Sequence, residues 1–204
     1  MDTFFNICAI LIGVKIAAFP HKEGVDRSPM KEQAILQKWI RNLVDFIVIL
    51  SLAWFVVHSF FSLARVSGHS MEPSLSAGDT VLVDEFFYQF KKPKRYDVVL
   101  FQKKDKSNNI KRIIGLPGET VIIQNGRVYI NGTLLETDKL SPIVLEGVAK
   151  NPVELGENEY FLLGDNTDSS EDSRFQNMGN IQESQIVGRV WFRIFPFRKI
   201  SLIG

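Results

Sequence analysis

Residues 120–132, TVIIQNGRVYING, contain the clearest structural signal in the chain. β-Branched and aromatic residues lie on both sides of the dipeptide Asn125-Gly126, which supplies the positive φ angles that a type I′ turn requires. This stretch therefore predicts a β-hairpin.

Four more stretches have the same composition, rich in β-branched and aromatic residues: TVLVDEFFY (80–88), DVVLF (97–101), EYFLLGD (159–165) and IVGRVWFRIF (186–195). Turn residues separate them, and no convincing amphipathic helix follows Arg65. We therefore expect a mainly β fold, an antiparallel sheet assembly. Leu140 to Glu157 is the least patterned stretch and is expected to be rich in loops.

The size and charge of the chain limit what it can be. Its 204 residues leave room for one ordinary domain and an anchor. The net charge is +1, and no basic stripe with interleaved aromatics indicates nucleic-acid binding. Cys8 is the only cysteine, so no intramolecular disulfide can form, and the β domain must be held by its core alone.

Two apolar stretches precede the strands. Phe46 to Leu63, FIVILSLAWFVVHSFFSL, lies inside a segment long enough to cross about 30 Å of hydrocarbon as a helix. It is not at the N-terminus and lacks a small-residue cleavage site, so we predict a retained transmembrane anchor over residues 43–66. Residues 1–20 are a possible first transmembrane segment. Because Lys15 lies within it, that segment is compatible with spanning the membrane or with lying on it.

The basic residues predict the orientation. Residues 21–42 contain Lys22, Arg27, Lys31, Lys38 and Arg41, whereas Arg65 is the only lysine or arginine between the end of the apolar run at Leu63 and Lys91. Basic loops stay in the cytoplasm. Residues 21–42 are therefore expected to be cytoplasmic, and residues 67–204 should form a β domain on the exported side.

The histidines argue against a Ser-His-Asp hydrolase. His21 falls in the predicted cytoplasmic segment and His58 in the anchor. His69 adjoins Ser70, and neighbours on an extended strand point in opposite directions. With one cysteine, no His-x-x-x-His pattern and no carboxylate cluster at metal spacing, the sequence predicts no metal site.

A lysine is the remaining candidate base. A free lysine with a pKa near 10.4 is neutral in about one molecule in a thousand at pH 7.4, so a catalytic lysine must be desolvated. Lys111 is flanked by the apolar residues Ile110 and Ile114, and Ser70 stands before a turn that Pro73 fixes. Taken alone, these residues are also compatible with an ordinary edge lysine and a loop serine.

Five boxes, in order along the chain, resemble those of the bacterial type I signal peptidases. They are SGHSMEPSL (67–75), GDTVLVDEFFY (78–88), RYDVVLF (95–101), KRIIGLPGE (111–119) and GDNTDSSEDSR (164–174). The third departs from the family pattern, since Tyr96 replaces a glycine. The first box places the family's nucleophile on Ser70 and the fourth places its general base on Lys111, forming a Ser-Lys dyad.

The resemblance also assigns supporting roles. It implies that the backbone N–H of Ser70 contributes to the oxyanion hole. Some members of the family add a serine hydroxyl to this hole from the position two residues before the nucleophile, but that position is Gly68 in this chain. Ser170 falls on the serine that orients the lysine ammonium, while Asp172 and Arg174 fall on a structural ion pair. The turn residues Gly164, Asp165 and Asn166 shape the surroundings, and the predicted cleft-wall residues are Met71, Pro73 and Leu75.

The implied activity is that of a serine endopeptidase that removes signal peptides from secretory preproteins after small residues, without a cofactor or metal. The implied location is the bacterial plasma (inner) membrane, with the catalytic domain on the exported side. The family also has an apolar surface near the site, to which Phe86, Phe87 and Tyr88 are candidates to belong, resting on the lipid bilayer.

Three alternatives stay open on sequence alone. A self-cleaving repressor of the SOS type shares Ser-Lys chemistry, but it is soluble, and the apolar anchor argues against it. A processing peptidase of an organelle membrane belongs to the same class. A non-catalytic, membrane-tethered β module that binds exported proteins would retain the fold without the activity.

Overall fold

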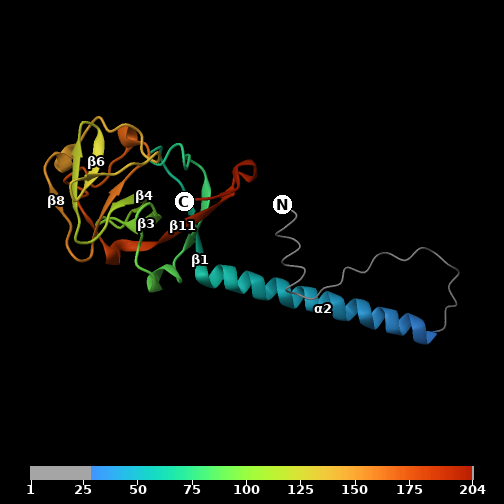
Figure 1. The fold of residues 1–204 in the computed structure, drawn as a ribbon. Coiled ribbons are helices and arrows are strands. Elements are labelled where there is room, and N and C mark those ends of the chain that lie inside the picture. Colours follow the sequence, from blue (N-terminus) through green and yellow to red (C-terminus); the bar gives the residue numbers. More distant parts are fainter. Residues whose placement is uncertain (1–28, 204) are drawn as a thin grey trace. The chain divides into compact units, whose positions relative to one another are not determined.

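The computed structural model describes residues 29–203 (Figure 1). The possible first transmembrane segment, 1–20, and the beginning of the predicted cytoplasmic segment lie outside the described residues. The chain divides into two units, 1–51 and 52–204, which are considered separately.

Helix α2, Pro29–Phe60, is the α-helix of the described chain. Its part Gln33–Phe60 has a mean hydropathy of 2.1 and is long and apolar enough to cross a membrane. Large apolar side chains along it are exposed, including Trp39 and Trp54, each at 66%. The apolar side chains of this helix are not buried against other parts of the described chain. Such exposure is what a helix surrounded by lipid shows.

The helix differs in extent from the predicted anchor, 43–66. It begins within the predicted cytoplasmic segment, and it ends at Phe60 because Phe61–Arg65 forms strand β1. Strand β1 pairs along its whole length with β2. Hydropathy could not locate this change from helix to strand. Phe61 and Leu63 continue the apolar run, but their backbone groups pair with another strand.

The larger sheet confirms the predicted antiparallel β fold. Its strands run in the order β1-β2-β11-β3-β4-β9-β10, with β12 paired to β11, and all its pairs are antiparallel. The bounds not yet given are β2 Thr80–Asp84, β3 Val98–Gln102, β4 Asn108–Gly115, β9 Glu159–Leu163, β10 Ile181–Gln182, β11 Ile186–Phe195 and β12 Ser201–Leu202.

The smaller sheet contains the hairpin predicted at 120–132. Its order is β7-β6-β5-β8, formed by β5 Thr120–Gln124, β6 Arg127–Ile130, β7 Thr133–Leu134 and β8 Val153–Glu154. Asn125 and Gly126 have φ angles of 50° and 73°, as the type I′ turn requires. The expected loop region 140–157 contains only β8 and the short 3-10 helix η2, Gly147–Lys150.

Strand β3 shows how the core fixes the larger sheet. Successive residues of a strand point to opposite faces. Val98 and Leu100 pack with Met71 and other residues of one cluster, while Val99 and Phe101 pack into a second cluster. Both faces are covered, which explains the uninterrupted apolar run. A third cluster joins the smaller sheet to β4 and β9.

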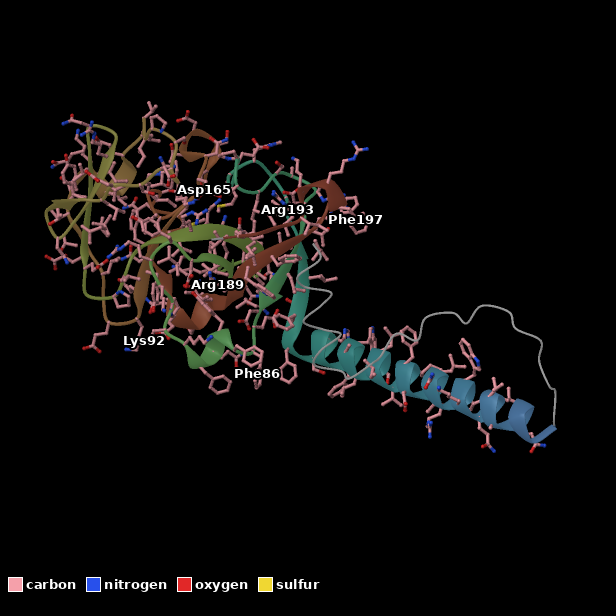
Figure 2. All side chains as sticks on the ribbon, turned by 45° about the vertical axis from the view of Figure 1, so that its right-hand side comes forward. Phe86, Lys92, Asp165, Arg189, Arg193 and Phe197 are labelled. Atoms are coloured by element: carbon pink, nitrogen blue, oxygen red, sulfur yellow. The ribbon has the colours of Figure 1, made fainter. Side chains whose placement is uncertain are left out.

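Aromatic side chains gather on the surface around η1, Tyr88–Phe90. Phe86 and Phe87 are 40% and 45% exposed, and Phe86 contacts Phe60, with ring centroids 4.7 Å apart. Figure 2 shows Phe86 near this surface and Phe197 at the tip of the β11–β12 hairpin, which contains η5, Phe197–Lys199. Tyr88 is instead buried, and its hydroxyl donates to Asp97 Oδ2 at 3.1 Å.

Candidate active site

Strand β4 positions Lys111. The residue pairs with Val99 of β3 in the middle of β4, and its side chain is 3% exposed. A strand over residues 108–115 was not predicted from the sequence. The segment NNIKRIIG mixes amides, charges and apolar residues, so its composition alone did not indicate a strand.

Ser70 lies in the tight loop that follows β1. The N–H of Leu75 donates to the Met71 carbonyl at 2.8 Å, and Met71 and Leu75 are almost fully buried. The carbonyl of Ser70 accepts a hydrogen bond from the N–H of Asn166 at 3.0 Å. Apolar anchoring on one side and this backbone hydrogen bond on the other hold the Ser70 main chain in place.

The two side chains meet although they are 41 residues apart in the sequence. Lys111 Nζ lies 2.6 Å from Ser70 Oγ. Burial lowers the pKa of Lys111 to about 8, against an ordinary value of 10.5. The negative charges of Asp172 and Glu171 oppose this effect, while the positive charge of Lys103 adds to it. A neutral amine in this position can accept the hydroxyl proton of Ser70.

The segment 164–174 carries charges that act on the lysine, those of Glu171, Asp172 and Arg174. Arg174 Nε lies 2.8 Å from Asp172 Oδ1, and this ion pair is buried. The N–H of Gly164 donates to Asp172 Oδ2 at 3.1 Å, and Arg174 Nη2 donates to the carbonyl of Thr167 at 2.6 Å. The pair therefore fixes the loop internally.

Ser170 is buried in the same loop, and its Oγ has no hydrogen-bond partner among the described residues. It neighbours Gly164, where an added Cβ would overlap the Ser170 side chain and lie 2.5 Å from the Ser70 carbonyl oxygen. Ser170 is thus packed beside the Ser70 loop, but the structure has no hydrogen bond from its hydroxyl to Lys111.

A second buried ion pair was not singled out from the sequence. Arg112 Nε and Nη2 donate to Asp165 at 2.8 and 2.7 Å, and both side chains are fully buried. Arg112 also donates to the Tyr96 carbonyl at 2.8 Å. Tyr96, at the family's glycine position, has a φ of 72°. In the sequence, the feature that could have indicated this ion pair is the arginine that follows Lys111 in the fourth box.

A cleft of about 440 Å³ opens beside Ser70. Met71 lines it, together with apolar residues from four strands and from the segments beside them: Leu63, Ala64, Val66, Leu100, Ile110 and Val187. Pro73 and Leu75 were predicted to line it and do not. Leu75 is fully buried in the core beneath, and Pro73 lies on the exposed outer side of its loop.

His69 does not take part in the contact between Lys111 and Ser70. Its ring is 65% exposed, and its Nδ1 lies 2.9 Å from Glu72 Oε1. His69 and Ser70 lie in a loop and not on an extended strand, so the alternation expected of strand neighbours does not apply to them.

Comparison with known proteins identifies the family. The family model described as "Signal peptidase, peptidase S26" matches residues 36–195. The chain belongs to the signal peptidase family. Signal peptidase I T of Bacillus subtilis is 34% identical over 87% of this chain and 94% of its own length. Signal peptidase I of Leptolyngbya laminosa is 34% identical over 87% of this chain and 88% of its own length.

A crystal structure of a signal peptidase I from Enterococcus faecalis is also similar, with 29% identity and a TM-score of 0.40 over 49% of this chain and 97% of that one. The family consists of serine endopeptidases, so the predicted enzyme class is confirmed. Its type I members are associated with membranes, in agreement with the apolar helix α2.

Proposed function

We propose that this signal peptidase removes signal peptides from secretory preproteins, with Ser70 as nucleophile and Lys111 as general base. The observation that supports the proposal best is the 2.6 Å separation of Lys111 Nζ from Ser70 Oγ at a lysine that is 3% exposed. A buried amine in contact with a hydroxyl is the arrangement that activates a serine without histidine.

The reaction follows from these two groups. Neutral Lys111 takes the proton from Ser70 Oγ as the oxygen attacks the scissile carbonyl, and the oxyanion that forms is stabilised in part by the N–H of Ser70. The lysine ammonium then gives its proton to the leaving amine, which leaves an acyl ester on Ser70. Water hydrolyses that ester with Lys111 again as base. Side chains supply both roles, so the proposal includes no metal or cofactor.

Two strand edges beside the cleft are suited to an extended substrate. Strand β1 is at the end of the sheet order, and residues 108–111 of β4 pair with β3 while β9 pairs with β4 only from Arg112 onward. Ser62 to Val66 and Asn108 to Ile110 line the cleft from these two strands. A peptide in the cleft can therefore hydrogen-bond to exposed strand edges, with small side chains beside Ser70.

We place the enzyme in the bacterial plasma membrane with its β unit on the exported side. The support is the basic composition of residues 21–42 and the membrane-length helix that leads into β1. The exposed aromatic residues around Phe86 and Phe87 are suited to rest on the lipid. A reporter fused after Arg174 should be active only outside the cytoplasm, and one fused near Arg27 only inside. The opposite pattern would contradict this placement.

Cleavage of a preprotein by the full chain in detergent tests the proposed chemistry. Ser70→Ala and Lys111→Met should each abolish cleavage while the fold is retained. Lys111→Arg should also be inactive, because arginine is not deprotonated in proteins. Lys104→Met is the matched control. Lys104 is exposed in the turn between β3 and β4, and it should be dispensable. A Lys111→Arg variant with the wild-type rate would refute the assignment.

A further inference from the structure

The cleft beside Ser70 has a charge at each end of β1. Its lining includes one carboxylate, Glu85, and one side chain of fixed positive charge, Arg65. The rest of the lining is apolar or neutral. A half-buried acidic group on the wall of a peptide-binding cleft affects which side chains can bind beside it, because an unpaired charge there is poorly solvated.

Glu85 lies at the end of the cleft away from the proposed nucleophile. It directly follows β2, and the register that pairs Phe61 with Asp84 and Arg65 with Thr80 places it beside the start of β1. The hydroxyl of Ser62 donates a hydrogen bond to Glu85 Oε1, which fixes the carboxylate toward the cleft. Ser67 and Ser70 line the other end, beyond Arg65.

The chain order gives the direction of a bound substrate. The part of a preprotein before the cut is apolar and comes from the membrane, and β1 begins where the membrane-length helix ends. The peptide before the cut should therefore pass the Phe61 end of β1 first and reach Ser70 last. From Ser62 to Ser67 the chain advances five residues, and a paired peptide rises by the same roughly 3.3 Å per residue.

We propose that Glu85, held by Ser62, is a specificity-determining residue of this cleft. It favours a basic or hydrogen-bond-donating side chain roughly five residues before the scissile bond and disfavours an acidic one there. This inference rests on the proposed function. It concerns a position upstream of the small residues that fit beside Ser70.

Binding by the inactive full chain tests the inference without requiring chemistry. Ser70→Ala protein in detergent is titrated with labelled signal peptides in which each position from the third to the eighth before the cut is in turn Lys, Gln or Glu. At one position near the fifth, Lys should bind about ten-fold more tightly than Glu. Gln should fall between them.

Variants of Glu85 show whether the carboxylate is the cause. Glu85→Gln keeps the size and the contact with Ser62 and should reduce the Lys-to-Glu ratio at that position to about one. Glu85→Lys should reverse the preference. Asp84→Asn is the matched control, because Asp84 is the adjacent acid but does not line the cleft, and it should leave the ratio unchanged.

Two results would overturn the inference: equal binding of the Lys and Glu peptides at every position, or a preference that persists in Glu85→Gln. Cleavage of the parent peptide by wild type is measured separately. Cleavage without the charge preference would refute the role of Glu85 alone, whereas the charge preference without cleavage would refute the proposed function alone.

Discussion

Replacing Lys111 by Met should stabilise the fold while it abolishes cleavage. Lys111 is 3% exposed, and burial lowers the pKa of its ammonium from 10.5 to about 8. The difference between these two values corresponds to about 3 kcal/mol of unfolding free energy, which the buried charge costs the native state near neutral pH. Met has a similar length, carries no charge and fills the same space.

The pH dependence gives this prediction its sign. Below pH 8 the lysine is protonated in both the folded and the unfolded chain, so the cost of burying the charge is constant. Between about pH 8 and 10.5 the unfolded chain binds more protons, so the stability of the wild type rises with pH. The advantage of Lys111→Met should therefore be full below pH 8 and disappear towards pH 10.5.

Denaturant unfolding of the full chain in detergent, repeated from pH 6 to pH 10.5, measures this difference. The control is Lys104→Met, which removes an exposed lysine and should change the stability little at any pH. A Lys111→Met variant that is less stable than wild type at pH 7, or a difference that does not depend on pH, would refute the argument that Lys111 is desolvated.

Three more predictions concern activity. First, kcat/KM should fall on the acidic side with a limb near pH 8, because burial lowers the pKa of Lys111, and His69→Ala should not move that limb; a limb near 6.5 that vanishes in His69→Ala would contradict the lysine base. Second, if the Ser170 hydroxyl orients the lysine during the reaction, Ser170→Ala should slow single-turnover cleavage roughly ten- to a hundred-fold, whereas an unchanged rate would leave Ser170 only a packing role. Third, Gly164→Ala should largely abolish cleavage, since its Cβ would lie 2.5 Å from the nucleophile's carbonyl oxygen, whereas Gly156→Ala makes only ordinary contacts of 3.5 Å and should stay active; equal activity of the two variants would show that the site tolerates the shift.

Local chemistry made several elements readable from the sequence. The Asn125-Gly126 turn and its flanking strands form as predicted, because the turn type depends on the φ angles that these residues allow. The length and composition of the apolar helix were also predictable, since hydropathy is a property of consecutive residues. The ordered boxes around Ser70 and Lys111 predicted the family and the enzyme class.

Other features depend on contacts between distant residues. The apolar run continues from helix α2 into β1, and only pairing with β2 decides that Phe61 belongs to a strand. Leu75 was predicted to line the cleft, but packing in the core beneath it determines its position.

The sequence by itself determined the family, the antiparallel β class and the pair of residues to examine, because these follow from local composition and ordered motifs. Only the tertiary structure decided the environment of that pair. The lowered pKa of Lys111 arises from burial in the fold, and its contact with Ser70 joins residues 41 positions apart. Desolvation and contact distance depend on all the neighbours that folding brings together, and no single segment of the chain specifies them.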